Sequence, residues 1–264
     1  MQTPDVVELG RGGGVLDCFV VPWDTAIFGF PVADIRRFEL GEGQAPADAL
    51  TALDDWCAEE GVRLASCRLD HARLRESMAL EDAGFRFGEM VHVPHFADWD
   101  RIGTPTRRID VSEATADDLA SVQAIAASAF TTGRFLLDWR LPAELSHRRY
   151  AAWVRSSFES SGQNVLKAEV AGELVGFFIV ERRPDNAVYW HLTAISPGFQ
   201  GQGYGLSLWL TMLARHRAEG AIAVETTISG HNTAALSLYS RLGFSFTSAQ
   251  MTFHRLSDRA AVEP

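Results

Sequence analysis

Gln200-Gly201-Gln202-Gly203-Tyr204-Gly205, here called the glycine turn, lies between an apolar strand pattern and an apolar helix pattern. Upstream, Ala187 to Ile195 is rich in β-branched and aromatic residues, and Ser196-Pro197-Gly198 ends that strand. Downstream, apolar residues recur at helical spacing, at Leu206, Leu210 and Leu213. The stretch therefore predicts a strand, a tight turn and a helix, in that order.

The glycine turn has the chemistry of an anion site. Gly203 and Gly205 open the expected helix, whose first N–H groups have no partner within the helix, and the helix dipole favours a negative charge there. Glycine has no Cβ to keep phosphate oxygens away from the backbone, and it adopts positive φ readily. We therefore expect a pyrophosphate to bind at this turn.

The wider string resembles a known signature. Ile195-Ser196-Pro197 followed by Gln200-x-x-Gly203-x-Gly205 is similar to the acyl-CoA signature of the GCN5-related N-acetyltransferase (GNAT) superfamily. A second matching element follows, Asn232-x-x-Ala235-x-x-Leu238-Tyr239-x-x-x-Gly243-Phe244. The resemblance implies an α/β fold with a mixed sheet and acetyl-CoA as the acetyl donor. The donor-binding positions that it implies are Thr193, Ile195, Gln200, Gly201, Gln202, Gly203, Tyr204, Gly205 and Asn232.

Length and composition are those of a globular protein. The chain has 264 residues, 47% of them hydrophobic and 22% charged, which suits one large or two small domains. It contains no apolar run near the roughly 20 residues that a membrane span requires. Met1 to Gly10 lacks the charged-then-apolar pattern of a signal peptide. We therefore expect a soluble, cytoplasmic protein.

Net charge and cysteine content exclude further classes. The formal net charge of -10 argues against binding of nucleic acid, so any anionic ligand must be held by local donors. Cys18, Cys57 and Cys67 are odd in number and share no ligand spacing with a histidine, so neither a disulfide framework nor a metal site is expected. The sequence leaves open whether the protein forms a homodimer.

The chain contains an internal sequence similarity that predicts two domains. His71 to Phe87 ends in Ala83-Gly84-Phe85, just as the later helix ends in Leu242-Gly243-Phe244. We interpret residues 1–103 as a smaller, degenerate GNAT-like domain without a glycine turn, and residues 104–264 as the acetyltransferase domain. Asp98 to Thr106, with a glycine and a proline, is the expected linker.

Tyr239 is the candidate general acid. Asn232, Ala235, Tyr239 and Leu242 follow at spacings of three, four and three, so they share one helix face. The resemblance implies that the tyrosine hydroxyl lies near the thioester sulfur. A thiol pKa is about 8.5 and a phenol pKa about 10, so Tyr239 can stay protonated and donate to sulfur as charge develops. The alternative is a packed tyrosine whose hydroxyl has a structural partner.

The remaining catalytic roles are less specific. The resemblance implies that the strand ending at Ile195 splays from the next strand, so that free backbone groups at Thr193 and Ile195 pair with the pantetheine arm. His191 and Glu225 are candidate bases for the incoming amine, and both lie among apolar neighbours that displace pKa values. Each is alternatively a structural residue, with water as the base.

Acceptor specificity is expected in the irregular stretch Ser128 to Trp139. Together with the aromatic segment Trp23 to Phe30, it resembles the dTDP-fucosamine N-acetyltransferases, which acetylate a nucleotide-linked amino sugar. Arg134 is then the candidate for a diphosphate contact and Asp138 for sugar hydroxyls. The predicted acceptor-binding residues are Ser128, Arg134, Phe135, Asp138 and Trp139. The alternative is that this segment packs against the first domain.

The sequence thus predicts an enzyme. We expect acetyl-CoA-dependent N-acetylation of a small-molecule amine, foremost a nucleotide-linked amino sugar. A second enzymatic interpretation is acetylation of an antibiotic or of a peptide or protein amine. A third, of another class, is an acyl-CoA-binding sensor or scaffold without turnover.

Overall fold

The computed structural model describes residues 5–7 and 14–257. Its contacts divide the chain into two compact units. Unit 1 comprises the chain up to Val91, Arg134–Leu145 and the chain from Ser248, and unit 2 comprises His92–Gly133 and Ser146–Thr247. The beginning of the chain, predicted to lack a signal peptide, lies mostly outside the described residues.

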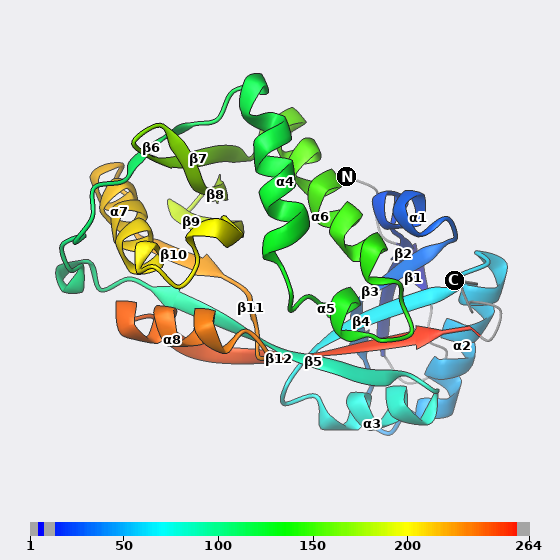
Figure 1. Cartoon of the computed structure of the whole chain (residues 1–264). Coiled ribbons are helices and arrows are strands. Elements are labelled where there is room, and N and C mark those ends of the chain that lie inside the picture. The colour runs from blue at the N-terminus through cyan, green and yellow to red at the C-terminus, as the bar shows by residue number, and fades with distance from the viewer. Residues whose placement is uncertain (1–4, 8–13, 258–264) are drawn as a thin grey trace. The chain divides into compact units, whose positions relative to one another are not determined.

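Unit 1 is built on a mixed sheet in the strand order β1-β2-β3-β4-β12 (Figure 1). Only β3 and β4 among these pair in parallel; β12 runs antiparallel to β4. Helices α2 and α3 cover it through a core that includes Leu53, Leu80 and Phe253. The elements are β1 Asp5–Val7, β2 Val15–Val20, α1 Pro22–Phe28, β3 Val32–Glu39, α2 Pro46–Glu59, β4 Leu64–Asp70, α3 Leu74–Asp82, the start of β5 Arg86–Phe96, α5 Arg134–Leu137 and most of β12 Ser245–Leu256.

Unit 2 has the strand order β5-β10-β9-β8-β7-β6, in which only β9 and β10 pair in parallel. A tight turn at Ala171-Gly172, with φ values of 52° and 83°, joins β7 to β8. The elements are η1 Trp99–Arg101, β6 Asp110–Glu113, η2 Ala116–Asp118, α4 Leu119–Ala129, α6 Ala143–Glu159, β7 Asn164–Val170, β8 Glu173–Arg182, β9 Ala187–Ile195, η3 Pro197–Phe199, α7 Tyr204–Ala218, β10 Ala223–Thr226, β11 Ile228–Ser229 and α8 Thr233–Leu242.

Two layers of helices cover the sheet of unit 2 (Figure 1). Val188 and Trp190 of β9 belong to the core that packs against α7 and α8. Leu192 and Ala194 of the same strand belong to the core that packs against α4 and α6. The predicted mixed α/β fold is therefore confirmed, with β9 in the middle of the layered unit that carries the glycine turn.

Helices α3 and α8, whose ends are similar in sequence, end in the same way. After α3, Gly84 has φ +81°, and the N–H of Phe85 donates to the carbonyl of Leu80 at 2.9 Å. After α8, Gly243 has φ +88°, and the N–H of Phe244 donates to the carbonyl of Tyr239 at 3.0 Å. A left-handed glycine is the residue that closes a helix in this manner. Leu80 therefore stands in unit 1 where Tyr239 stands in unit 2.

The strands that follow these helices do not respect a single boundary at residue 103. The strand after α3 is β5, and its His95 and Phe96 pair with Glu225 and Val224 of β10 in unit 2. The strand after α8 is β12, and its Gln250–Leu256 segment pairs with β4 in unit 1. The backbone hydrogen bonds of each strand are thus satisfied by the other part of the sequence, which makes both units discontinuous in the chain.

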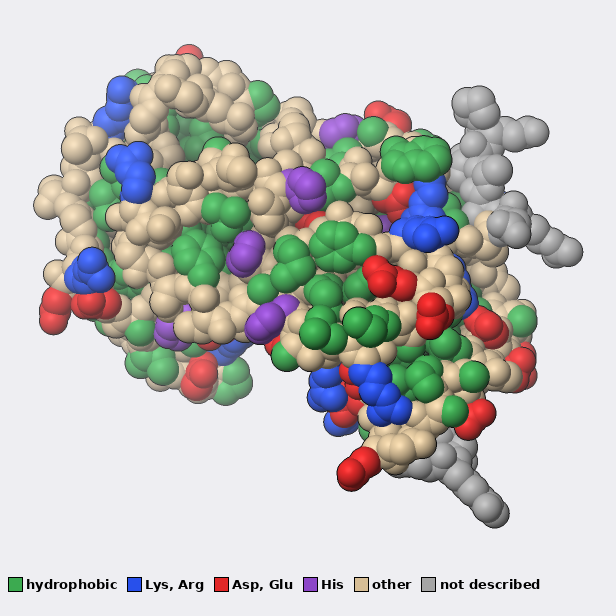
Figure 2. Space-filling view, turned by 90° about the horizontal axis from the view of Figure 1, so that it is seen from below, with side chains coloured by type: hydrophobic (Ala, Val, Ile, Leu, Met, Phe, Trp, Pro, Cys, Tyr) green, Lys and Arg blue, Asp and Glu red, His purple; other side chains and the backbone are tan. Residues whose placement is uncertain are grey.

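The surface carries scattered large hydrophobic side chains. Figure 2 shows hydrophobic side chains among acidic and basic ones on one face of the molecule. In unit 1 the exposed ones are Trp23, Leu74, Met78, Phe87 and Trp139. In the predicted aromatic segment, Phe28 and Phe30 are buried whereas Trp23 is exposed. Within the described ranges, no helix is both long and apolar enough to cross a membrane.

Candidate functional site

The glycine turn has the backbone that its sequence predicts. Gly203, with φ +83°, is the N-cap of α7, and Gly201 has φ +73°. A Cβ at either position would have no protein atom within 4 Å, so the space before the turn is open. A side chain there would fill this space and strain the backbone. Such a turn fits a phosphate group that approaches the first N–H groups of α7.

The two glutamines of the turn hold it in shape. Nε2 of Gln200 donates to the carbonyl of Ile195 at 3.0 Å, and Nε2 of Gln202 donates to the carbonyl of Gly198 at 2.6 Å. Their side-chain amides therefore tie the turn to the end of β9 and to η3. Tyr204 packs its ring 5.5 Å from that of Phe199.

Strands β9 and β10 separate next to this turn. Their parallel ladder ends at the pair Trp190 and Thr226, where Oγ1 of Thr226 donates to the carbonyl of Trp190 at 2.8 Å. Because β10 ends at Thr226, Thr193 and Ile195 have no ladder partner in β10. The edge of β9 at Thr193 is therefore available to an extended ligand, as the resemblance implies, whereas the carbonyl of Ile195 already accepts the hydrogen bond from Gln200.

A β-bulge at His191 sets the directions of the side chains on β9. The register with β8 shifts there, since Ile179 pairs with Leu192 and Val180 with Trp190. The extra residue interrupts the alternation of the strand, so that His191 and Leu192 both face the side of α4 and α6. Thr193 consequently points to the α8 side, where Tyr239 lies.

Tyr239 is fully enclosed in unit 2. Its side chain is 2% exposed and packs against the rings of Trp190, Trp209 and Phe244. Burial raises the pKa of Tyr239 to about 12, although Trp209, Thr193 and Thr226 stabilise the ionised hydroxyl. The hydroxyl is therefore protonated at neutral pH, and it lies with Thr193 and Thr226 where β9 and β10 part.

Asn232 has a structural contact of its own. It is the N-cap of α8, and its Oδ1 accepts a hydrogen bond from the N–H of Ala235 at 3.0 Å. A capping residue of this kind satisfies one of the free N–H groups at the helix start. Its amide oxygen is thus engaged in the helix, so any donor contact predicted for Asn232 falls to its amide NH₂ group.

His191 has a carboxylate partner that the sequence analysis did not single out. Nε2 of His191 lies 2.7 Å from Oε2 of Glu181, and the imidazole ring lies 4.8 Å from the ring of Tyr189. His191 is mostly buried, with a side chain 19% exposed. Glu181 lies in β8. Its pairing depends on the register of β8 with β9, which no local pattern reveals.

Glu225 is held in a cross-strand row. Glu181, Tyr189, Glu225 and His95 are successive Cα partners across β8, β9, β10 and β5. Oε1 of Glu225 lies 3.2 Å from Nδ1 of His95, and its Oε2 pairs with Arg183. Arg183 therefore compensates the charge of Glu225, with His95 beside it, whereas Glu181 faces His191.

Comparison with known proteins identifies the domain around this site. Residues 131–244 match the family described as the acetyltransferase (GNAT) family. The chain contains an acetyltransferase domain of the GNAT superfamily. Members of this superfamily use an acyl-CoA donor, typically acetyl-CoA. The glycine turn, the open edge of β9 and Tyr239 all belong to the matched GNAT region.

Three curated relatives differ in what they act on. The chain is 25% identical to the dTDP-fucosamine acetyltransferase of Escherichia coli O6:H1, over 88% of this chain and 95% of that protein. It is 36% identical to the L-2,4-diaminobutyric acid acetyltransferase of Nocardia farcinica, over 40% of this chain and 54% of that protein. It is 23% identical to the spore coat polysaccharide biosynthesis protein SpsD of Bacillus subtilis, over 52% and 47%. The match thus spans about half of the last two relatives.

Solved structures share the fold over nearly the whole chain. A GCN5-related N-acetyltransferase from Sphaerobacter thermophilus has a TM-score of 0.65, covers 92% of this chain and 76% of its own, and is 13% identical. A tandem GNAT protein from the clavulanic acid biosynthesis pathway has a TM-score of 0.59, with 96% and 82% covered, at 14% identity. The fold likeness therefore extends over the N-terminal region as well as the matched GNAT region.

The segment predicted to bind the acceptor divides between the units. Ser128, at the end of α4 in unit 2, donates through Oγ to the carbonyl of Ala124 at 2.8 Å. Phe135, in α5, is buried in unit 1 against Phe28 at a ring distance of 5.1 Å. Trp139 is 90% exposed. From Arg134 onward the segment packs in unit 1, which agrees with the alternative of packing against the first domain.

Arg134 and Asp138 have charged partners within unit 1. Nη1 of Arg134 lies 3.6 Å from Oδ1 of Asp34, its Nη2 lies 3.9 Å from Oδ2 of Asp24, and it donates to Oγ of Ser66 at 2.9 Å. Asp138 receives two hydrogen bonds from the guanidinium of Arg140, at 2.8 and 2.7 Å. A diphosphate at Arg134 would therefore compete with carboxylates that are already in place, which favours a structural role.

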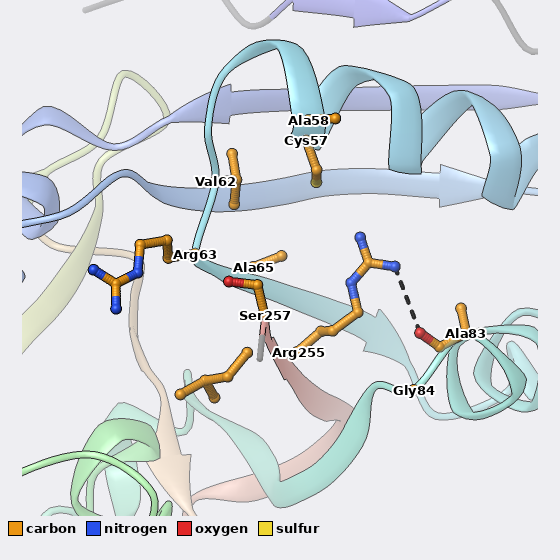
Figure 3. Close-up of a pocket in the computed structure, with 10 residues that line it drawn as sticks. Cys57, Ala58, Val62, Arg63, Ala65, Ala83, Gly84, Arg255 and Ser257 are labelled. Atoms are coloured by element: carbon orange, nitrogen blue, oxygen red, sulfur yellow. Dashed lines mark hydrogen bonds between the residues drawn. The ribbon is translucent and has the colours of Figure 1, made fainter. Parts of the chain in front are cut away.

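A cavity of about 550 Å³ lies in unit 1, lined by Cys57, Arg63, Gly84 and Arg255 among others (Figure 3). Arg255 reaches across it to the carbonyl of Ala83 at 3.5 Å. Burial raises the pKa of the Cys57 thiol, so it stays protonated and is no nucleophile. None of the predicted site residues lines this cavity.

Proposed function

We propose that the protein transfers the acetyl group of acetyl-CoA to a primary amine of a small molecule, with a nucleotide-linked amino sugar as acceptor. The placement of Tyr239 beside the free edge of β9 and the glycine turn supports the transferase activity. The similarity to dTDP-fucosamine acetyltransferase, which covers 95% of that protein, supports the acceptor class.

In this proposal the glycine turn binds the pyrophosphate, and Thr193 and Ile195 pair with the pantetheine arm through their backbone. When bound, acetyl-CoA supplies the acetyl group as a thioester. The amine nitrogen forms the new bond to the acetyl carbon, the carbon–sulfur bond breaks, and the proton lost by nitrogen balances the proton gained by sulfur.

Tyr239 acts as the hydrogen-bond donor to sulfur. With a pKa of about 12, Tyr239 is a weaker acid than an exposed tyrosine, whose pKa is about 10. Complete transfer of its proton to a thiolate of pKa about 8.5 would therefore be strongly uphill. Tyr239 therefore stabilises the negative charge that develops on sulfur by a hydrogen bond. The proton that the sulfur finally gains is balanced by the one that the amine loses.

His191 is the stronger of the two candidate bases. Its partner Glu181 accepts a hydrogen bond from the imidazole and stabilises the imidazolium that proton uptake creates. Both carboxylate oxygens of Glu225 already have partners, one in His95 and the other in Arg183. We therefore assign proton removal from the amine to His191 and an electrostatic role to Glu225.

A panel of amines tests the acceptor class. Purified protein and acetyl-CoA are incubated with dTDP-amino sugars, the corresponding free amino sugars and diamino acids, and thiol release and acetylated products are measured. We expect turnover with the nucleotide-linked sugar and much less with the free sugar. Equal efficiency on both would eliminate the nucleotide-sugar acceptor.

A second acceptor is favoured by one comparison. The 36% identity to a diaminobutyric acid acetyltransferase makes the amine of a small amino acid the next candidate. Turnover of diamino acids, but of no sugar, would establish it in place of the first. Tight acetyl-CoA binding without turnover of any amine, antibiotic and peptide amines included, would instead establish a sensor or scaffold.

A further inference from the structure

The glycine turn has no positive charge of its own. Residues 200–205 contain glycine, glutamine and tyrosine alone, while the whole chain has a formal net charge of -10. The two glutamine amides are used within the turn. An acyl-CoA donor, in contrast, carries a pyrophosphate and a 3′-phosphate. Neutral N–H groups can bind these anions, but a nearby cation would stabilise them further.

The segment before β6 is fixed to the first turns of α7. Oγ of Ser207, a side chain 1% exposed, accepts a hydrogen bond from the N–H of Arg107 at 3.2 Å. The same oxygen lies 3.1 Å from Oγ1 of Thr106. These contacts hold the backbone of Arg107 close to the start of α7, all within unit 2.

The side chain of Arg107 is placed on the first residue of α7. Its guanidinium carbon lies 4.6 Å from the centroid of the Tyr204 ring, a cation–π contact, and Tyr204 follows the N-cap Gly203. Arg107 is exposed. Among the residues that the structure describes, no carboxylate lies within 4.0 Å of its guanidinium nitrogens. A stacked guanidinium keeps its N–H donors free at its edge.

We propose that Arg107 binds a phosphate of the acyl-CoA donor and supplies the positive charge that the glycine turn lacks. This inference rests on the proposed function and adds a residue outside the turn to the donor site. Tyr204 then serves as the platform that holds the guanidinium beside the turn. The pyrophosphate and the 3′-phosphate offer the same chemistry, and the choice between them is made by experiment.

The neighbouring Arg108 provides a matched control. It is also exposed, but its Nε lies 3.2 Å from Oδ1 of Asp110 and it has no contact with α7 among those described. Arg107→Gln and Arg108→Gln therefore remove one positive charge each from adjacent positions. A difference between the two variants reports the location of the guanidinium rather than the net charge of the protein.

Calorimetric titration with coenzyme A and with dephospho-coenzyme A tests the proposal without any acceptor. We expect Arg107→Gln to bind coenzyme A about 5- to 30-fold more weakly than the parent protein, since a charge-assisted contact is lost at an exposed position. Arg108→Gln should stay within about 2-fold. Arg107→Lys should recover part of the affinity, because it restores the charge without the planar fork.

The two ligands separate the two phosphates. Loss for coenzyme A alone assigns the contact to the 3′-phosphate, and equal loss for both ligands assigns it to the pyrophosphate. Parent-like affinity of a folded Arg107→Gln protein, or equal losses in the Arg107 and Arg108 variants, would overturn the proposal. Absence of coenzyme A binding by the parent protein would instead contradict the proposed function.

Discussion

Helices α3 and α8 end in the same way but differ in the side chain before the closing glycine. Tyr239 and Leu80 precede equivalent left-handed glycines, yet only Tyr239 has a hydroxyl, and only its surroundings include Thr193 and Thr226. Leu80 is fully buried in the core of unit 1. The role that we propose for Tyr239, donation to the sulfur, is therefore possible in unit 2 and not at Leu80.

Tyr239→Phe tests that role with the ring retained. We expect kcat to fall by a factor of about 10² to 10⁴, the usual contribution of a general acid, with coenzyme A affinity nearly unchanged. Steady-state kinetics and calorimetry on the same preparation measure both quantities. Parent-like turnover would assign the tyrosine to packing.

Arg134→Ala separates a structural role from a diphosphate contact. The substitution leaves Asp24, whose side chain is 1% exposed, and Asp34 without this cation. We expect a loss of about 1–3 kcal/mol in the free energy of unfolding, since a buried carboxylate loses a neighbouring cation. Urea denaturation measures it. Unchanged stability together with a KM for a nucleotide sugar raised tenfold or more would reinstate the diphosphate contact.

His254 gives unit 1 a defined sensitivity to acid. It is 1% exposed, and burial lowers its pKa, while its Nδ1 lies 3.1 Å from Oδ2 of Asp138. Burial alone would raise the pKa of Asp138, but hydrogen bonds from Arg140 and His254 outweigh it and lower that pKa. The neutral imidazole therefore donates to a carboxylate.

The sign of the pH effect follows from these directions. Because the pKa of His254 is lower in the folded than in the unfolded protein, the unfolded state binds more protons below pH about 6.5, and stability falls as pH falls through that value. The Asp138 contribution is lost only in stronger acid, below pH about 4. We expect the thermal midpoint of His254→Gln to vary less than that of the parent between pH 7.5 and pH 5.5. Parallel curves would contradict the assignment.

Whole elements position the donor site through their ends. The N-terminus of α7, the end of β9 after its bulge and the end of β10 meet around the glycine turn and Tyr239. Each end leaves backbone groups without a partner in its own element. The proposed donor site thus consists largely of main chain.

Gly203→Val tests the turn at the level of the element. Valine at φ +83° is strained, and its side chain would fill the open space before α7. We expect coenzyme A affinity to fall by at least about tenfold, the loss of a charge-assisted contact. Gly220→Val is the matched control, because Gly220 has φ +78° and follows α7 at its other end. It should show similar strain in thermal melts and parent-like affinity, and equal affinity losses in both variants would contradict the assignment.

At the scale of the whole molecule, the exchange of β5 and β12 binds the two parts of the sequence together. Residues 1–103 contain β4, whose partner is β12, and residues 104–264 contain β10, whose partner is β5. Cutting the chain at 103 would leave both edges unpaired. The predicted domains, residues 1–103 and 104–264, remain a proposal.

Expression of 1–103 and 104–264 as separate chains tests this. We expect neither fragment alone to unfold cooperatively, and we expect co-expression to restore the fold, since β5 and β12 then regain their partners. Circular dichroism melts and coenzyme A titrations are the measurements. Cooperative unfolding of 104–264 alone, with parent-like affinity, would show that the exchange is dispensable.

Local patterns in the sequence predicted the elements around the site that we propose for the donor. The strand Ala187 to Ile195, the glycine turn and the helix after it were all expected from the sequence, and they are β9, the turn and α7 in the structure. Strand β3, Val32–Glu39, was not predicted from the sequence. Such features depend on neighbours a few positions away, which a sequence displays directly.

Tertiary structure alone decided the pairings between distant residues. The contact of His191 with Glu181 depends on the register of β8 with β9 and on the bulge. The contact of Arg107 with Tyr204 depends on the path of the segment before β6. The contacts of Arg134 with Asp24 and Asp34 depend on the packing of α5. Local sequence determines which backbone a segment adopts, but partner choice depends on how the remaining polar groups are satisfied once the chain is compact. Residue type therefore predicted the proposed donor site, whereas only the fold showed which charged side chains have charged partners.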